Sequence, residues 1–185
     1  MAPENIASRL TVIMHTYDRP EFVDSDVREG RWNEIPLLIT DDASSPQVQV
    51  RLQSLAEEFG HRFTALQENG GPARAALHGV EFCGTEFFAL CGDDDYLRDF
   101  PAFAEEALEL AADPNTLFVV MPEVRSLGKD RPEKVQFDRR TFEGSTGREL
   151  LRELVYGGEM RALQAGTIIR SAEAQPHFAS SLFRT

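Results

Sequence analysis

Cysteine, tryptophan and lysine are scarce in this chain of 185 residues, and long apolar runs are missing from it. The two cysteines, Cys83 and Cys91, form no CxxC pair. Their small number excludes a disulfide scaffold and favours a reducing, cytoplasmic setting. No apolar segment approaches the length that a bilayer span or a signal peptide requires. We therefore expect a soluble protein with no transmembrane segment.

Positive charge is also in short supply. The chain has 19 Lys and Arg residues against 31 Asp and Glu residues, a net charge of -12. Such a balance argues against nucleic acid and anionic membranes as partners, because both attract a basic face. Residues 1–99 hold 18 of the acids and 8 of the bases, and the first lysine is Lys129. Any divalent cation is therefore expected in the first half of the chain.

Short apolar runs alternate with helical patterns along the chain. The runs predict strands over 10–15, 35–40, 62–66, 86–91, 117–121 and 166–170. Helices are predicted over 21–29, from Pro46 to about Gly60, and over 73–82, 100–112 and 147–156, with a loop or hairpin at 123–145. This alternation predicts an α/β domain with a mostly parallel central sheet that helices cover on both faces.

Three of the predicted strands end in polar or acidic loops, with the sequences HTYDRP, DDASSP and GDDDYL. Ligands of open parallel sheets bind outside the carboxyl ends of the strands. The predicted fold therefore brings the three loops to one rim, where we expect the functional site.

Three adjacent carboxylates, Asp93, Asp94 and Asp95, follow the fourth strand. Adjacent carboxylates repel one another unless a cation or hydrogen bonds compensate. Their hard oxygen ligands suit Mg²⁺ or Mn²⁺, which commonly bind carboxylates together with substrate phosphates. A solvated acidic turn before the next helix is the alternative, and the two other loops on the rim favour the metal.

The other rim residues each allow a functional and a structural interpretation. One of Asp41 and Asp42 would accept from a base or a ribose, or the pair would serve the turn and the helix that follows, or each Asp would take one of these two roles. Tyr17 would stack on a nucleobase, or simply pack, and His15 would contact the ligand or be structural. The turn before Arg74 would bind an anion at a helix start, or be a plain loop with a surface arginine.

Four segments in order resemble the family 2 glycosyltransferases of the GT-A fold. They are LTVIMHTYDRPEF, LLITDDASS, the glycine turn in ENGGPARAALHGVEF, and the DxD-type motif in CGTEFFALCGDDDYL. The resemblance covers residues 9–99 and continues more loosely to about residue 170. It implies a Rossmann-like three-layer α/β/α sandwich, with a nucleotide-sugar and metal half over 1–99 and a partial acceptor-side half over 100–185.

The resemblance also implies roles for single residues. The donor site would be made by His15, Thr16, Tyr17, Arg19, Asp41, Asp42, Arg74, Asp93 and Asp94. The metal, Mn²⁺ or Mg²⁺, would be held by Asp93, Asp94 and Asp95. A UDP- or GDP-linked sugar would be transferred with inversion to a hydroxyl of a glycan, lipid or protein acceptor, and a homo-oligomer is allowed.

The sequence departs from the family pattern where the acceptor should be activated. Asp18 replaces the common Asn, and Ala76-Leu77 stands where Arg-Asn is usual in the glycine helix. Beyond Arg170 the one acid is Glu173, which lies too close to the last strand to match the family's catalytic base. We therefore assign no catalytic residue. A truncated or degenerate module that binds nucleotide-sugar without turnover is the alternative, and a nucleotidyl- or phosphoryl-transfer enzyme is a second.

Overall fold

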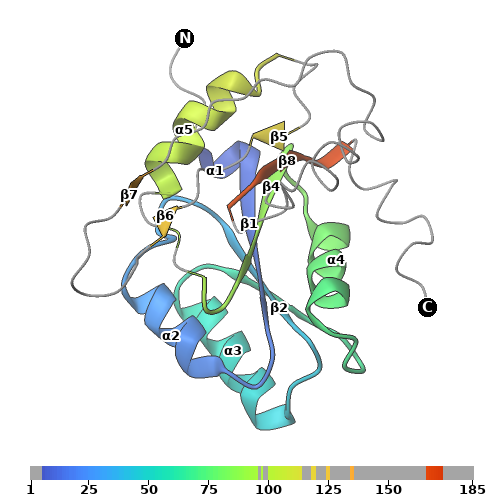
Figure 1. Cartoon of the computed structure of the whole chain (residues 1–185). Helices are drawn as coiled ribbons and strands as arrows, with labels where there is room; N and C mark the ends of the chain where they lie inside the picture. The colour runs from blue at the N-terminus through green and yellow to red at the C-terminus, as the bar shows by residue number, and fades with distance from the viewer. Residues whose placement is uncertain are drawn as a thin grey trace.

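A computed structural model describes residues 6–95, 97, 100–113, 118–119, 124–125, 134–135 and 166–172 (Figure 1). Its helices are α1 (Ile6–Arg9), α2 (Pro20–Arg28), α3 (Pro46–Glu58), α4 (Pro72–Phe82) and α5 (Phe100–Leu110). Its strands are β1 (Leu10–Thr16), β2 (Leu37–Asp41), β3 (Arg62–Ala65), β4 (Phe87–Gly92), β5 (Phe118–Val119), β6 (Val124–Arg125), β7 (Lys134–Val135) and β8 (Ile168–Arg170).

The main sheet has six strands in the order β3-β2-β1-β4-β8-β5. The first four are parallel, and β8 runs antiparallel to both β4 and β5, so the predicted mostly parallel sheet is confirmed. The strand order reverses between β1 and β4, and such a switch point leaves a crevice at the carboxyl ends of the two strands. The loops after β1 and β4 therefore flank the place where a ligand of this fold binds.

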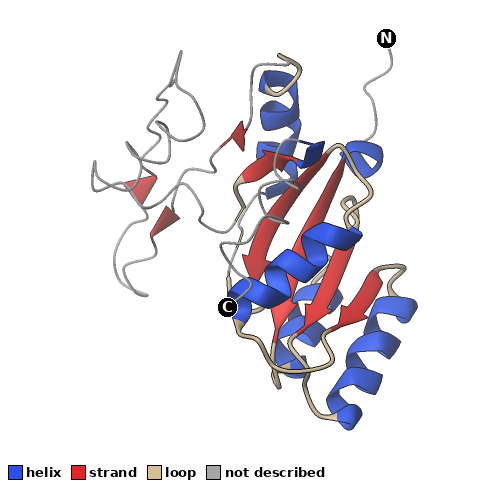
Figure 2. Ribbon diagram, turned by 90° about the vertical axis from the view of Figure 1, so that its right-hand side faces the viewer, coloured by secondary structure: helices blue, strands red, loops and turns tan. Residues whose placement is uncertain are grey.

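Helices cover both faces of the sheet, as the alternation of strands and helices predicted. On one face Leu10, Val12 and Met14 of β1 pack in a core with residues of α2, α3 and α5. On the other face Ile13 packs with Val80 of α4. Figure 1 shows α2 and α5 on one side of the sheet and α4 on the other, and Figure 2 shows the strands side by side. The result is the expected three-layer α/β/α sandwich.

The helix α4 lies unusually close to the sheet at Gly79. A Cβ atom at this position would be 2.3 Å from Cγ2 of Ile13 and 2.7 Å from the hydroxyl oxygen of Thr40. No side chain fits there, so glycine lets α4 lie directly on β1 and β2. This close approach fixes where the first turn of α4 meets the rim.

The predicted elements of the first 110 residues are confirmed, with ends that differ by up to two residues. The strand predicted at 35–40 begins only after Pro36, which lacks the N–H group that a strand interior needs. Sequence patterns missed the short α1, whose Ile6 packs against the main core. The strands β6 and β7 pair antiparallel, in agreement with a hairpin at 123–145. The helix predicted at 147–156 lies outside the described residues.

Membrane-spanning helices were sought only among the residues that the structure describes. There, no helix combines the length and the apolar character that crossing a bilayer requires.

Candidate functional site

The ends of β1 and β4 are joined by a hydrogen bond between side chains. The hydroxyl of Thr16 donates to Oδ2 of Asp93 at 2.6 Å. Both residues are buried. The register pairs His15 of β1 with Gly92 of β4, which brings the ends of the two strands together. The sequence predicted that the two loops share a rim, and the structure places them in direct contact.

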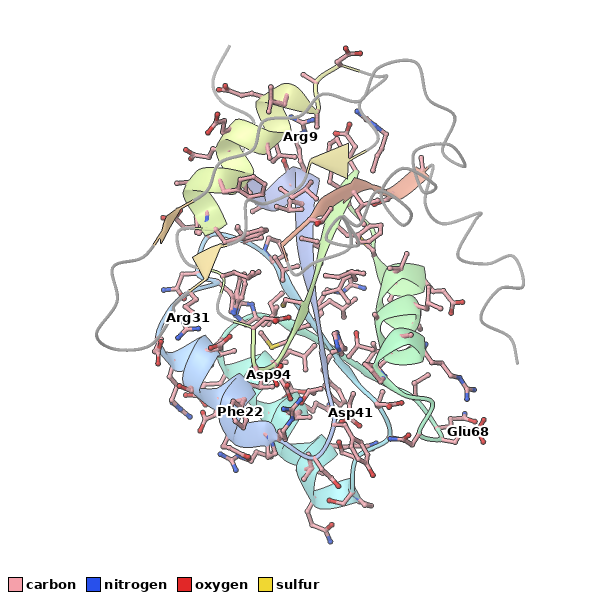
Figure 3. The ribbon with its side chains drawn as sticks, viewed as in Figure 1. Arg9, Phe22, Arg31, Asp41, Glu68 and Asp94 are labelled. Carbon is pink, nitrogen blue, oxygen red and sulfur yellow. The ribbon has the colours of Figure 1, made fainter. Side chains whose placement is uncertain are left out.

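Arg19 bridges two carboxylates of the acidic loop. Its Nη2 atom lies 2.6 Å from Oδ1 of Asp93, and its Nη1 atom donates to Oδ2 of Asp94 at 2.9 Å. The guanidinium also lies over the ring of Phe22, 5.5 Å from its centre. Figure 3 labels Asp94 and Phe22 at the end of the sheet where this contact lies. The hydrogen bond to Asp94 is the largest cause that raises the pKa of Arg19.

Asp93 is a buried carboxylate with a cation on one side. Burial raises its pKa, and the hydrogen bond from Thr16 and the charge of Arg19 act in the opposite direction. Its Oδ1 atom approaches Arg19 at ion-pair distance but has no partner in hydrogen-bond geometry among the described residues. The charge of Arg19 therefore compensates this oxygen.

The third carboxylate of the loop has a different role. Oδ2 of Asp95 accepts a 2.6 Å hydrogen bond from the backbone N–H of Gly92 and so closes the turn. A Cβ atom on Gly92 would lie 3.1 Å from Oδ1 of Asp94 and 3.2 Å from Oδ2 of Asp95. Both carboxylates thus fold back over the space that glycine leaves open.

The donor set of this loop fits a divalent cation only in part. In the described part of the chain, no group of three or more His, Cys, Asp or Glu side chains is arranged to hold a metal ion. Asp93 and Asp94 nevertheless share one cationic partner, and a buried oxygen of Asp93 faces it. Mg²⁺ and Mn²⁺ often bind through one or two carboxylates plus phosphate oxygens, and this pair offers donors of that type.

The two acids of the second loop are both buried, and each has a structural partner. Oδ2 of Asp41 accepts from the N–H of Ser44 at 2.8 Å and from the amide of Gln49 at 3.1 Å, and its Oδ1 accepts from the Ser44 hydroxyl. Asp41 therefore holds the turn that leads into α3, which is the structural alternative that its sequence context allowed.

Asp42 fills the anion cradle that the glycine turn was expected to offer. Its two carboxylate oxygens accept from the backbone N–H groups of Gly70 and Gly71, each at 2.7 Å. The side chain of Asn69 also donates to its carbonyl oxygen at 3.2 Å. Backbone N–H groups at a helix start attract anions. Here the anion that they bind is supplied by the chain itself.

Two residues in the left-handed backbone conformation lie in the loops after β1 and β2. Asp18 has a φ angle of +52° and Ala43 one of +59°. Asp18 is held there by Ser44 and Ser45: its N–H donates to the Ser44 hydroxyl at 2.8 Å, and its Oδ1 accepts from the Ser45 N–H at 3.3 Å. Asp and Asn tolerate this conformation better than most residues, so Asp18 suits this position.

The remaining predicted site residues are placed as follows. Tyr17 is 46% exposed beside the rim contacts of Thr16. His15 is half-buried, and its Nδ1 atom is buried without a hydrogen-bond partner among the described residues. Arg74 pairs with Glu68 at 3.0 Å, and Figure 3 shows Glu68 well apart from Asp94. The structure thus brings Thr16, Arg19, Asp93 and Asp94 together and leaves Arg74 in a separate ion pair.

A buried carboxyl that sequence analysis did not single out lies on α2. Asp26 pairs with Arg31 at 2.8 Å, and burial is the largest cause that raises its pKa, with Asp93 among the charges that add to the rise. Its helical spacing from the buried Val23 and Val27 was the available signal, because it places Asp26 on the inner side of the helix.

Comparison with known proteins identifies the class of this domain. The model of glycosyl transferase family 2 matches residues 11–170, and the chain therefore belongs to this family. A teichoic acid poly(glycerol phosphate) polymerase of Staphylococcus epidermidis is 26% identical over 137 residues, which are 71% of this chain and 18% of that protein.

Solved structures give the same fold. The crystal structure of S. aureus TarS 1–349 has a TM-score of 0.60 at 19% identity, over 91% of this chain and 49% of that one. The same protein in complex with UDP has a TM-score of 0.59 at 18% identity, over 91% and 48% of the two chains. The chain therefore has the GT-A fold of these glycosyltransferases and spans about half the length of the TarS structures.

Proposed function

We propose that this chain binds the nucleoside diphosphate of a sugar donor at the rim and transfers the sugar, with inversion, to an acceptor hydroxyl. The observation that carries the proposal is the joining of Thr16, Arg19, Asp93 and Asp94 at the switch point of the sheet. Basic and acidic groups meet there where a ligand of this fold binds. Membership of glycosyl transferase family 2 supports the same reaction class.

A divalent cation fits the two carboxylates that Arg19 now bridges. We propose that Asp93 and Asp94 hold Mn²⁺ or Mg²⁺, and that Asp95 supports the turn through Gly92. When bound, such an ion neutralises the negative charge that develops on a departing diphosphate. The predicted third ligand, Asp95, has one oxygen engaged by the backbone N–H of Gly92 and would reach the ion through its remaining lone pairs.

The base of the nucleotide would lie over the first two loops. Tyr17 offers an exposed ring on which a base stacks, and His15 lies at the end of the same strand. Asp42 keeps lone pairs beyond those used by Gly70 and Gly71, with which it would accept from a base N–H. UDP is the first nucleotide to test, because TarS has been crystallised with it. No described residue is assigned as general base.

Calorimetry with UDP-sugars and GDP-sugars tests the proposal, each with and without Mn²⁺, alongside an assay of sugar transfer and donor hydrolysis. We expect metal-dependent binding of one nucleotide series and release of its nucleoside diphosphate. Binding without turnover would identify a nucleotide-sugar-binding module. Tighter binding of nucleoside triphosphates than of nucleotide-sugars would favour nucleotidyl or phosphoryl transfer, and absence of any nucleotide binding would contradict the proposal.

A further inference from the structure

Arg19 occupies the two carboxylates that the proposed function assigns to a divalent cation. One terminal nitrogen of its guanidinium meets Asp93 at 2.6 Å, and the other meets Asp94 at 2.9 Å. A divalent cation and the guanidinium repel each other, so binding of the ion at these oxygens weakens the ion pairs of Arg19. Arg19 therefore competes with a divalent cation for this pair.

The surroundings of Arg19 allow it to leave the pair and remain at the rim. Its side chain is 43% exposed and that of Asp94 is 56% exposed, whereas the side chain of Asp93 is fully buried. The ion pair between Arg19 and the exposed Asp94 changes an equilibrium constant only a few-fold, whereas the buried Asp93 requires that another cation replace the guanidinium. The ring of Phe22 lies 5.5 Å from the guanidinium and offers it a second neighbour at the same place. Arg19 also sits directly before α2, so its backbone is held while its head group moves.

The diphosphate of a donor is a better partner for a released arginine than a carboxylate pair already neutralised by metal. Guanidinium groups form paired, charge-assisted hydrogen bonds with phosphate oxygens. Asp93 needs a cation in every state, because a buried carboxylate without one is strongly disfavoured. If the metal ion replaces Arg19 at Asp93 while Arg19 binds the diphosphate, the buried carboxylate keeps a cation and the arginine gains phosphate oxygens.

We propose that Arg19 is the resident counter-ion of Asp93 and Asp94 in the ligand-free protein, and that it passes to the donor diphosphate when a divalent cation occupies both carboxylates. This inference rests on the proposed function and assigns Arg19 two successive partners. It explains why a basic residue contacts both carboxylates of a pair expected to bind metal.

The test is the affinity for Mn²⁺ alone, measured without nucleotide by the electron paramagnetic resonance signal of free Mn²⁺. We expect Arg19→Gln to bind Mn²⁺ about two- to fivefold more tightly than the wild type, because a competing cation is gone. In the presence of Mn²⁺ the same variant should bind UDP or GDP about tenfold more weakly, because the diphosphate loses charge-assisted bonds. These opposite shifts separate the exchange from a purely structural role.

Arg62→Gln is the matched control, since it removes one positive charge at the start of β3, away from the rim. We expect it to leave both affinities at wild-type values. Arg19→Lys keeps the charge but lacks the fork that bridges the two carboxylates, so we expect a smaller gain in Mn²⁺ affinity than in Arg19→Gln. It serves if Arg19→Gln does not fold. Equal or weaker Mn²⁺ affinity in the folded Arg19 variants, or undiminished nucleotide affinity, would overturn the exchange. The proposed function fails differently, when the wild-type protein binds neither nucleotide with Mn²⁺.

Discussion

The hydroxyl of Thr16 donates a 2.6 Å hydrogen bond to Asp93, which lies 77 residues further along the chain. The bond ties the end of β1 to the acidic loop after β4, across the point where the strand order reverses. Arg19 meets the other oxygen of Asp93 at 2.6 Å. The Asp93 carboxylate is thus fixed from two sides before any ligand binds, and the geometry of the rim depends on these two contacts.

Replacing Thr16 by valine tests the first contact. Valine has nearly the shape of threonine but leaves one buried oxygen of Asp93 without its donor. We expect Thr16→Val to lower the free energy of unfolding by about 2 kcal/mol, since hydrogen bonds to buried charged groups have that magnitude. Thr16→Ser keeps the hydroxyl and should lose clearly less, as measured by urea denaturation. A loss in Thr16→Val no larger than the loss in Thr16→Ser would contradict this contribution of the hydrogen bond, because only the serine variant loses a methyl group.

Much of this fold could be predicted from the pattern of apolar residues. The hydrogen-bond and ion-pair partners of the rim side chains could not. Short buried runs such as residues 10–15 and 86–91 predicted strands of one mostly parallel sheet, and the loops after them were therefore expected on one rim. That the two strands are neighbours is seen only in the structure. The direction of β8 could not be predicted, because a short apolar run fits either direction. Nor does sequence reveal that Asp95 bonds Gly92, or that Arg19 takes two partners, since both depend on distances between folded loops.

The carboxylates of the acidic loop should differ in their effect on metal-dependent binding. We expect Asp94→Asn to weaken Mn²⁺-dependent nucleotide binding at least about tenfold, because its oxygen is proposed as a direct ligand. Asp95→Asn should change it much less, since an asparagine oxygen still accepts from the Gly92 N–H. Calorimetry on the two matched variants compares these effects. A larger loss in Asp95→Asn would make Asp95 the principal ligand.

Asp26 on α2 and Glu29, which caps the C-terminal end of that helix, should give pH trends of opposite sign. Burial raises the pKa of Asp26 in the folded protein above its ordinary value of 3.8. Its contribution to stability is therefore complete below that value and is lost as pH rises through the folded pKa. Hydrogen bonding to Arg31 lowers the pKa of Glu29 below 4.5, so its contribution is present above that value and is lost on acidification.

Urea denaturation between about pH 3 and pH 7 measures both trends as differences from the wild type. We expect Asp26→Asn to gain stability relative to the wild type as pH rises. Glu29→Gln should lose stability relative to the wild type over the same change. Parallel trends in the two variants would contradict the assigned causes, because burial is the largest cause at Asp26 and hydrogen bonding to Arg31 is the largest at Glu29.

Replacing Ala43, in the second loop, by glycine should stabilise the folded protein. Its φ angle of +59° costs a residue with a side chain about 1–2 kcal/mol. Glycine avoids this strain, but the greater conformational entropy of glycine in the unfolded chain offsets part of the gain. We expect Ala43→Gly to raise the free energy of unfolding by about 0.5–1 kcal/mol. Ala73→Gly, in the exposed first turn of α4, should lower it by up to about 1 kcal/mol. A loss at Ala43 would mean that this loop relaxes in the variant.

Asp42 acts as an internal anion for the glycine turn, and its removal should open a site for an external one. Asp42→Ala deletes the acceptor of the Gly70 and Gly71 N–H groups, and we expect a loss of about 2–3 kcal/mol. Added sulfate should then raise the melting temperature of Asp42→Ala more than that of the wild type, because it can occupy the emptied helix start. Asp41→Ala is the control, since its lost bonds to Ser44 and Gln49 leave no such cradle. Equal responses of both variants to sulfate would mean that the Gly70–Gly71 turn changes its conformation when Asp42 is removed.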